Sequence, residues 1–404
     1  MLRILFCPAH YTHDGSIRGS EVAWSYQITS YFLRVCQKSE LVTGFGTGRF
    51  LSKIHCLQPE KTFIDLSLRN ALTFNLKYSW FSFKASLSGK FDVIHHVLPF
   101  EMGHTFDLFK IVFPFFTCKY IIGPLQQSLP FYEDNISDVL ISKTTNQNSP
   151  LLLFSFRITE ILSKLTLRRA DAIVAIDAQT KRTLVERFTL PADKIAVISP
   201  GVDVATFSGA KTPRINKKTI SLLSVGTLMS RKRFDVLLTT LYILIFEKKR
   251  NVTLTILGSG PQQKHLEELA ASLGIKKKVF FVGTVPHSQV QKFYQNADIF
   301  VSASAHESWG QMYLEAMASG LPIVSTENHG SSTILKRSFG CIVARGDSNG
   351  LATKINTLIE RPEKRLAMGE QALQHAMQHY DWNAVILPKY TDLYQRITIK
   401  KNDI

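Results

Sequence analysis

Short apolar runs alternate with helix-length segments along the chain, and this alternation limits the fold more than any other feature of the sequence. Helices are expected between the runs, for example over residues 21–35, 234–247 and 261–273. Because short buried strands separated by helices are typical of parallel sheets covered on both faces, the sequence predicts a doubly wound α/β fold. The expected strands are residues 2–6, 41–43, 91–96, 120–124, 172–176 and 195–201 in the first half, and 220–225, 252–257, 279–283, 299–301, 323–325 and 341–343 in the second.

A polar segment divides this alternation into two halves of similar size. Residues 203–219 lack hydrophobic periodicity and are predicted to be a linker. We therefore expect two Rossmann-like domains, residues 1–200 and 201–380, that face each other across a cleft. Residues 381–404 are expected to form a helix that returns to the first domain. Since open parallel sheets bind ligands beyond the carboxyl ends of their strands, the loops at those ends are the candidate binding sites.

Composition narrows the classes of partner. The 404 residues carry a net charge of +16, which permits an anionic partner such as nucleic acid, anionic lipid or a phosphorylated substrate. No zinc finger and no basic motif interleaved with aromatic residues is present, so nucleic acid is not expected. Five scattered cysteines without metal-ligand spacing predict a reducing compartment, with neither disulfides nor a zinc site. With no secretion signal and no apolar run of about 18 residues or more, a cytoplasmic protein is expected.

The first half of the chain is rich in phenylalanine. Two interpretations stay open: helices packed in the core, or an apolar surface that touches lipid with help from the positive charge. The residues concerned are Phe106, Phe109, Phe113, Phe115, Phe116 and residues 151–156.

Residues 306–326 contain the pattern most specific for function. Glu307 follows the apolar run 299–301, Gly310 is expected near a helix start, and Glu315 lies about two turns later. The unpaired N–H groups and positive dipole end of a helix start suit a diphosphate, and carboxylates suit sugar hydroxyls. The alternative is a capping Glu307 and an exposed Glu315. The glycine between the two glutamates and the Gly-Leu-Pro sequence after them favour the site.

Together with other motifs, this block resembles retaining glycosyltransferase family 4 (glycosyl transferases group 1), whose fold is called GT-B. The similarity extends over essentially the whole chain, and it is more specific in residues 222–347 than in the first half. It implies an acceptor-binding first domain and a donor-binding second domain. The matching motifs are Gly226 with Arg231 and Lys232, Gly260, Gly283, Asp298, Glu307 with Glu315, Gly330 and Asp347, and in the first half Gly19 to Glu21 and residues 92–96, 123–125 and 200–203.

For the donor, the resemblance implies that Lys232 and Arg231 neutralise the diphosphate, that Glu315 holds the ribose and that Glu307 lies beside the transferred sugar. Many family members carry arginine where this chain has Thr227, so Arg231 is the candidate to supply that charge. Further residues of the same loops complete the implied donor site, namely Gly226, Gly260, Trp309, Gly310, Gln311 and Met312.

In the first domain, the resemblance implies that Gly19 and Ser20 belong to a loop near the diphosphate and the acceptor. His95 and His96 end a strand that points at the predicted cleft. Because side chains alternate along a strand, one of the two is expected to face the site as a catalytic candidate. The alternative, a buried structural histidine, stays open.

These features predict a retaining hexosyltransferase (EC 2.4) that moves a sugar from a nucleotide-sugar donor to a hydroxyl of a glycan, lipid-linked or small-molecule acceptor. No Asp-x-Asp motif is present, so neither a metal nor another cofactor is expected. The basic charge and the phenylalanine-rich half favour a cell-envelope acceptor and peripheral contact with the inner face of an anionic membrane. The alternatives are a nucleotide-sugar epimerase, a phosphorylase on the same fold, and a non-catalytic basic binding protein.

Overall fold

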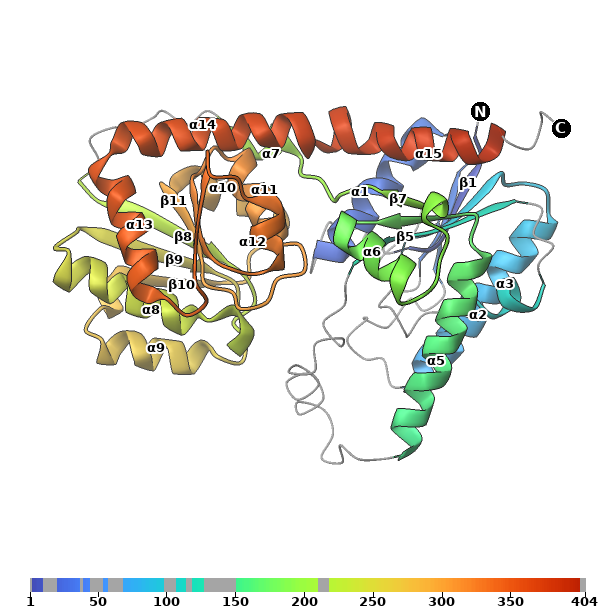
Figure 1. The fold of residues 1–404 in the computed structure, drawn as a ribbon, viewed down its shortest axis with the longest axis horizontal. Helices are drawn as coiled ribbons and strands as arrows, with labels where there is room; N and C mark the ends of the chain where they lie inside the picture. Colours follow the sequence, from blue (N-terminus) through green and yellow to red (C-terminus); the bar gives the residue numbers. More distant parts are fainter. Residues whose placement is uncertain are drawn as a thin grey trace. The chain divides into compact units, whose positions relative to one another are not determined.

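A computed structural model describes residues 2–9, 20–36, 39–43, 54–56, 68–97, 107–113, 118–126, 150–209 and 218–399. The chain divides into two compact units (Figure 1). The first domain consists of Met1–Pro200 together with Ile386–Ile404, and the second consists of Gly201–Val385. Each is built around one parallel sheet, so the predicted α/β class with two Rossmann-like domains is confirmed. That the domains face each other across a cleft stays a prediction.

The first domain contains a seven-stranded sheet in the order β3-β2-β1-β4-β5-β6-β7, with every described pair parallel. The order reverses between β1 and β4, where a doubly wound sheet places its binding edge. Only β3 was not predicted, because three residues at the sheet edge offer no pattern. The strands are β1 (Ile4–Ala9), β2 (Glu40–Thr43), β3 (Ile54–Cys56), β4 (Val93–His96), β5 (Lys119–Leu125), β6 (Ala172–Ala175) and β7 (Ile195–Val197).

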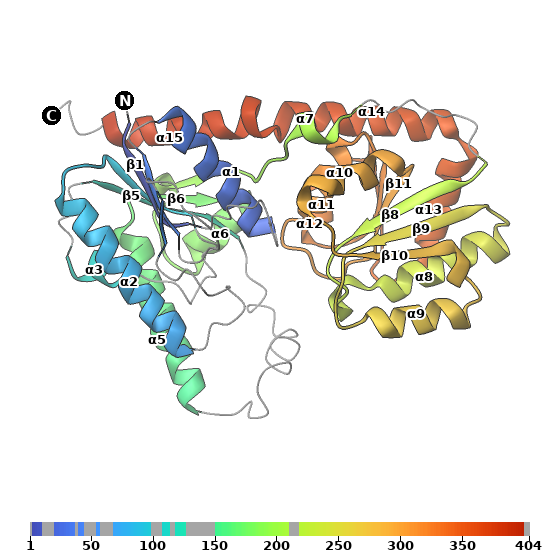
Figure 2. The same cartoon turned by 180° about the vertical axis from the view of Figure 1, so that it is seen from behind.

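Helices cover both faces of this sheet (Figure 2). On one face, α2 and α5 bury Tyr78 and Leu167 against strand residues such as Leu5, Ile94 and Ile122. On the other, α1 packs on β1 and β2. The helical elements are α1 (Ser20–Val35), α2 (Leu68–Leu87), α3 (Leu108–Val112), α5 (Pro150–Arg169), α6 (Ala178–Glu186) and η4 (Ala192–Lys194).

The last helix, α15 (Leu387–Ile399), belongs to the first domain, as predicted. The ring of Tyr394 meets the ring of Phe32 edge-on, with centroids 5.0 Å apart. Its hydroxyl lies 2.6 Å from Nδ1 of His95 at the end of β4. Tyr390 and Tyr394 are both fully buried, so α15 completes the core on the α1 side.

The second domain contains a six-stranded parallel sheet in the order β10-β9-β8-β11-β12-β13. Leu222, Leu254 and Val301 pack with α8, α9 and α13 in one hydrophobic core, and α10 and α11 contact β8 and β12. The elements are β8 (Ile220–Val225), η5 (Ser230–Lys232), α8 (Phe234–Tyr242), η6 (Ile243–Glu247), β9 (Val252–Leu257), α9 (Gln263–Ser272), η7 (Lys276–Lys278), β10 (Val279–Gly283), α10 (His287–Asn296), β11 (Ile299–Ser302), α11 (Gln311–Ala318), β12 (Ile323–Thr326), α12 (His329–Ile334), β13 (Gly340–Val343), α13 (Ser348–Glu360), α14 (Pro362–His379) and η8 (Trp382–Ile386).

The predicted linker is wrong at its start. Residues Val204–Phe207 form the short helix α7, which begins where the side chain of Asp203 accepts a hydrogen bond from the amide of Thr206. Phe207 is buried and its ring lies 5.6 Å from that of Tyr294. Through Phe207, α7 therefore packs against α10 of the second domain. Residues 210–217 lie outside the described part of the chain.

Among the described residues, no helix is long and apolar enough to cross a membrane.

Candidate active site

Two glycine loops at the ends of β8 and β9 pack directly against each other. The amide of Leu228 donates to the carbonyl of Ser259 (3.0 Å), and the amide of Gln262 donates to the carbonyl of Leu228 (3.0 Å). A Cβ on Gly260 would lie 2.5 Å from that same Leu228 oxygen. Gly260 is therefore required by the close approach of two backbones, which brings the β8 loop into its position.

The β8 loop carries two of the predicted site residues. It leaves the strand at Gly226 (φ +159°) and forms the turn η5 over Ser230–Lys232. The side chain of Lys232 extends back over Gly226, where a Cβ would lie 3.5 Å from the Lys232 Cε. Arg233 follows with φ +50°, a left-handed conformation that ends the turn and starts α8.

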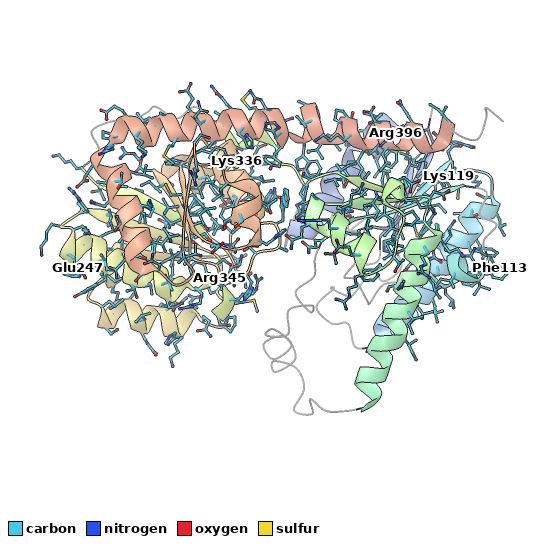
Figure 3. All side chains as sticks on the ribbon, viewed as in Figure 1. Phe113, Lys119, Glu247, Lys336, Arg345 and Arg396 are labelled. Carbon is cyan, nitrogen blue, oxygen red and sulfur yellow. The ribbon has the colours of Figure 1, made fainter. Side chains whose placement is uncertain are left out.

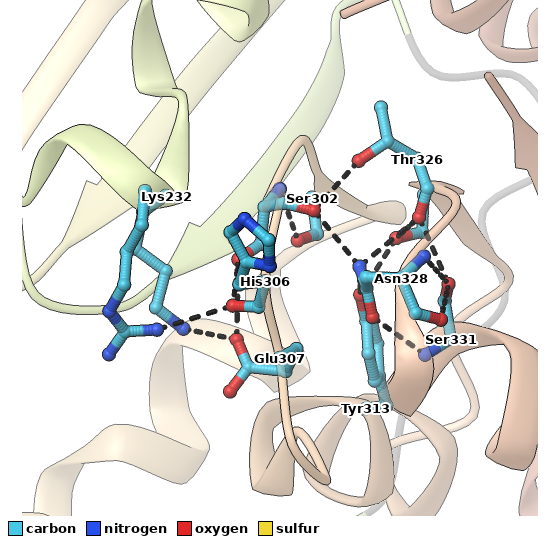
Figure 4. A network of polar contacts seen from close by, with 11 residues as sticks. Lys232, Ser302, His306, Glu307, Tyr313, Thr326, Asn328 and Ser331 are labelled. Atoms are coloured by element: carbon cyan, nitrogen blue, oxygen red, sulfur yellow. Dashed lines mark hydrogen bonds and ion pairs between the residues drawn. The ribbon is translucent and has the colours of Figure 1, made fainter. Parts of the chain in front are cut away.

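Lys232 and Glu307, which are 75 positions apart, form an ion pair through Nζ and Oε2 (Figure 4). Their side chains are only 10% and 13% exposed. The backbones of the two loops are joined as well, since the amide of Ala305 donates to the carbonyl of Arg231 (2.9 Å). Arg231 returns a hydrogen bond from Nη1 to the carbonyl of His306 (3.2 Å). The structure thus brings Arg231, Lys232 and Glu307 into one cluster at the edge of the sheet.

Glu307 is held by further contacts that the sequence did not predict. The Ser304 hydroxyl donates to the carbonyl of His306 (2.9 Å) and lies 3.4 Å from the Glu307 carboxylate. The amide of Gly330 donates to the carbonyl of Glu307 (2.9 Å). A side chain on Gly330 would collide with the carbonyl oxygen of Trp309. The loop that carries Glu307 is therefore fixed from both sides.

A buried network of amide and hydroxyl groups beside this loop supports it (Figure 4). Asn328, at the start of α12, donates from Nδ2 to the carbonyl of Ser304 (3.0 Å) and to the hydroxyl of Tyr313 (3.2 Å). Its Oδ1 accepts from the amide of Ser331 (2.8 Å). Because Asn328 is 2% exposed, these bonds form away from water and hold β11, α11 and α12 together.

Helix α11 begins beside the ion pair. Its N-cap, Gly310, has φ +89° and has no side chain to cap the helix, while its carbonyl accepts a hydrogen bond from the amide of Tyr313 (2.9 Å). A Cβ at Gly310 would lie 2.6 Å from the Tyr313 ring and 3.0 Å from Cγ of Glu307, which leaves glycine as the residue that fits. A helix start next to a lysine suits an anion.

The side chains around this helix start point into the second domain. Trp309 is 2% exposed, and its ring meets that of Tyr380 at a centroid distance of 6.1 Å. Gln311 donates from Nε2 to the carbonyl of Gly201 (2.8 Å), and Met312 is buried. These three side chains are therefore engaged within the second domain.

Glu315 lies on α11, one to two turns beyond this start, and is 8% exposed. The hydroxyl of Tyr294 donates to its Oε2 at 2.7 Å. Burial raises the pKa of the Glu315 carboxyl to about 7, and the hydrogen bond from Tyr294 opposes that rise. Tyr294 in turn stacks on Phe300 of β11, with ring centroids 5.7 Å apart. Tyr294 gave no signal in the sequence because it belongs to a different helix.

Of the predicted loop residues in the first domain, Gly19 and Ser20, the structure describes only a part. Gly19 lies outside the described residues. Ser20 is the first residue of α1, and its side chain lies outside the described part.

His95 and His96 are both fully buried at the end of β4. Nε2 of His95 donates to the carbonyl of Gly123 (3.0 Å), because a carbonyl only accepts, and Nδ1 then accepts from the Tyr394 hydroxyl. Burial lowers the pKa of each imidazole to about 3, so both rings are neutral. His95 thus joins β4, β5 and α15, and His96 lies 3.5 Å from the hydroxyl of Tyr120.

Two family models match the chain. The model of the glycosyl transferases group 1 matches residues 210–375, and that of glycosyltransferase family 4 matches residues 131–206. Together they cover more than half of the 404 residues. The chain belongs to glycosyltransferase family 4. The first match contains the Lys232–Glu307 pair and helix α11.

Curated members of the family share part of the sequence. A D-inositol 3-phosphate glycosyltransferase 2 of Catenulispora acidiphila is 30% identical over 243 residues, which are 56% of each chain. A D-inositol 3-phosphate glycosyltransferase of Corynebacterium urealyticum is 33% identical over 207 residues, 47% of this chain and 48% of the relative. The chain therefore spans about half the length of the curated relatives it matches.

Solved structures match the family fold over nearly the whole chain. A glycosyltransferase from Rickettsia africae has a TM-score of 0.69 at 18% identity and covers 100% of this chain and 99% of its own. Sucrose-phosphate synthase from Thermosynechococcus elongatus has a TM-score of 0.71 at 17% identity (99% and 100%). Anabaena HepE in complex with UDP and glucose has a TM-score of 0.66 at 17% identity (98% and 100%). At such identities the likeness shows the GT-B fold.

Proposed function

We propose that this protein transfers a sugar from a nucleotide-sugar donor to a hydroxyl acceptor, with retention of the anomeric configuration and without a metal ion. The observation that supports this most is the Lys232–Glu307 ion pair at the start of α11. It places a cation, an acid and the positive end of a helix at one sheet edge, next to Arg231. Those are the groups that a sugar linked to a diphosphate requires.

In the proposed donor complex, the diphosphate lies between Lys232, Arg231 and the first N–H groups of α11. Glu307 would then exchange its bond with Lys232 for hydrogen bonds from hydroxyls of the transferred sugar. Glu315 would accept hydrogen bonds from the ribose. HepE, which shares the fold, holds UDP and glucose in its solved structure, and this favours a uridine nucleotide as the first donor to test.

The proposed chemistry is a substitution on one face of the sugar. The bond from the anomeric carbon to the phosphate oxygen breaks, and that oxygen takes the electron pair. The acceptor oxygen forms the new bond on the same face and passes its proton to the departing phosphate. Lys232, Arg231 and the start of α11 stabilise the charge on the phosphate, which is the role a metal ion has in other transferases. Neither His95 nor His96 is assigned a step, because both rings are buried.

The proposed acceptor is a lipid-linked or cell-envelope glycan or a small phosphorylated polyol. Two curated relatives carry the name of an inositol phosphate glycosyltransferase, which supports the polyol. The net charge of +16 supports an acceptor that carries phosphate. Placement in the cytoplasm, with peripheral contact at the inner face of a membrane, is part of the same proposal.

A screen of nucleotide sugars tests the donor. At a donor concentration one hundred times its Kd, the free energy of unfolding rises by about 2.7 kcal/mol, which raises Tm by roughly 5–10 °C for a domain of this size. NMR of the product formed from that donor in the presence of EDTA then reports the anomer. A retained configuration at full rate is expected. An epimerised donor without transfer, a requirement for metal or no donor binding would contradict the proposal.

Glu315 makes nucleotide binding depend on pH. A carboxylate that accepts ribose hydroxyls must be ionised, and its pKa is about 7 in the folded protein. We therefore expect the affinity for UDP to rise as pH increases through 7, with a proton released on binding. Calorimetry in buffers of different ionisation enthalpy measures that proton.

Glu315→Gln is the matched variant for this test, since it keeps the shape and removes the titration. It should bind UDP more weakly and release no proton. Between about pH 4.5 and 7 the folded state binds this proton and the unfolded state does not, so the stability of the native protein falls by up to about 1.4 kcal/mol per pH unit as pH rises. That fall should be absent in the variant. Equal proton release by both proteins would contradict a role for Glu315.

A further inference from the structure

Three helices of the first domain lie side by side on one face of its sheet. The start of α3 is bonded to both neighbours: the amide of Leu108 donates to the Ser79 hydroxyl of α2 (3.2 Å), and the amide of Asp107 donates to the Thr166 hydroxyl of α5 (3.1 Å). The inner sides of α2 and α5 are already packed, since Tyr78 and Leu167 are fully buried. Their outer sides are available for something else.

Those outer sides are apolar. On α2, Leu76, Trp80 and Leu87 are 40%, 47% and 59% exposed. On α5, the exposed residues are Ile158, Ile161 and Leu165. Each set follows the spacing of one helical face, so each helix presents a second apolar stripe in addition to the one that it buries. Isolated exposed apolar residues need no explanation, but two such stripes do.

Aromatic rings join α2 to α3. Phe109 of α3 lies 5.2 Å from Trp80 and 5.2 Å from Phe83, and Phe113 lies 5.0 Å from Phe83, measured between ring centroids. Phe113 is 43% exposed and lies at the surface of the first domain (Figure 3). The outer apolar surface, as it is called below, consists of Leu76, Trp80, Phe83, Leu87, Phe109, Val112, Phe113, Ile158, Ile161 and Leu165.

Positive charge surrounds the outer apolar surface. The three helices contain eight lysines and arginines, of which Lys110 is buried, and one glutamate, Glu160. Lys77 and Lys84 are exposed on either side of Trp80, and Nζ of Lys84 lies 4.9 Å from the centre of the Trp80 ring. Arg168 and Arg169 are exposed at the end of α5.

The nearby described carboxylates do not cancel this charge. Asp92 forms an ion pair with Arg3, Asp171 forms one with Lys119, and Asp107 is fully buried. An anionic surface is therefore the complementary partner.

We propose that the outer apolar surface docks on an anionic lipid bilayer. Tryptophan and phenylalanine at the level of the headgroups, with lysine and arginine beside them, are the combination that binds the interface of such a membrane. The biological purpose of this docking rests on the proposed function, the use of a lipid-linked acceptor. The membrane contact is assigned to α2, α3 and α5 of the first domain. The binding itself does not depend on catalysis.

Trp80 provides a direct readout. The protein has four tryptophans, and Trp24, Trp309 and Trp382 are 2%, 2% and 3% exposed, whereas Trp80 is 47% exposed. Addition of vesicles of equal parts phosphatidylglycerol and phosphatidylcholine should shift the emission to shorter wavelength, and brominated acyl chains should quench it. Vesicles of phosphatidylcholine alone should give a much smaller shift.

Variants separate the parts of the surface. Trp80→Phe should lose the emission shift and still float with anionic vesicles. Ile161→Ser with Leu165→Ser, and Lys77→Gln with Lys84→Gln, should each weaken flotation at least tenfold. Phe280→Ser is the matched control, because Phe280 is 51% exposed on β10 of the second domain, and it should float as the native protein does. An unchanged Tm shift with UDP shows that each variant is folded.

Several results would overturn the proposal. The first is that saturating anionic vesicles leave the tryptophan emission of the native protein unchanged, and the second is that neutral vesicles give an equal shift. The third is an emission shift that depends on protein concentration in the absence of lipid, which would indicate that a second copy of the chain covers the surface. Loss of sugar transfer in solution, with vesicle binding intact, would instead contradict the proposed function and leave the docking surface in place.

Discussion

Replacement of Lys232 by alanine is expected to lower kcat by about 10²–10³, the usual cost of removing one charge-stabilising donor from a site of this kind. Lys232 is the cation of the ion pair at the start of α11, and in the proposed mechanism it carries the charge of the leaving diphosphate. Because the diphosphate has that charge before reaction as well, the affinity for UDP should fall too. Steady-state kinetics with the donor found in the screen, and calorimetry with UDP, measure the two effects.

Arg233→Ala is the matched control. Arg233 follows Lys232 directly, but its guanidinium is 42% exposed and binds Asp235. Its loss removes the same charge from the same turn without touching the pair, so kcat and UDP affinity should stay within about twofold, as for an exposed ion pair. A Lys232→Ala protein with near-native turnover, or an Arg233→Ala protein with the same defect, would contradict the assignment of Lys232.

Replacement of Glu307 by alanine should not weaken the binding of UDP, in contrast to Lys232→Ala. In the absence of donor, Glu307 neutralises Lys232, and the diphosphate must compete with that carboxylate. Removal of the carboxylate therefore leaves Lys232 free for phosphate, and UDP should bind as tightly as to the native protein or several times more tightly. Transfer should still fall by about 10² or more, because the sugar loses a charged hydrogen-bond acceptor.

The two variants together test competition within the pair. Glu327→Ala serves as control, since Glu327 is an exposed acid in the loop after β12. Weaker UDP binding in Glu307→Ala, equal to that in Lys232→Ala, would show that Glu307 positions Lys232 and does not compete with phosphate. Circular dichroism and Tm exclude loss of the fold, which the Ser304 and Gly330 contacts maintain without the Glu307 side chain.

Glycines show how far sequence reasoning reaches. Gly260 and Gly310 were both predicted as donor-site residues. The structure gives each a structural cause of its own: Gly260 allows two backbones to approach, and Gly310 has a positive φ beside the Tyr313 ring. Neither cause can be found in the sequence, because the first depends on the distant loop around Leu228 and the second on the backbone conformation of Gly310 and the position of the Tyr313 ring.

The buried polar residues that hydrogen-bond the Glu307 loop and Glu315 could not be predicted from the sequence. Ser304, Tyr294 and Asn328 lie in ordinary surroundings along the chain. Ser304 bonds within the Glu307 loop itself, whereas Tyr294 and Asn328 acquire their roles only when their helices pack beside α11, where Tyr294 bonds Glu315 and Asn328 bonds the carbonyl of Ser304. Period and motif describe neighbours in sequence, whereas these bonds join neighbours in space.

Of the phenylalanines for which the sequence left two interpretations open, Phe113 is exposed, whereas Phe106, Phe115, Phe116 and the side chains of residues 151–156 lie outside the described part of the chain. Other aromatic residues of the same domain fall into both classes. Tyr78 and Phe81 pack in the core of the first domain. Phe113 and Trp80 are exposed on the same side of that domain. Composition counts both kinds alike, and only the side of the helix on which each residue falls separates them.

The sequence by itself determined that this chain forms two parallel-sheet domains and that Lys232, Glu307 and Glu315 belong to the candidate site, because strand alternation and motif spacing are local properties. The tertiary structure decided that Lys232 and Glu307 pair with each other. It does so because β8 and β11 are neighbours in the sheet, so that the loops at their carboxyl ends meet. It also decided that His95 is a buried link to α15, since that helix returns from the far end of the chain to cover it.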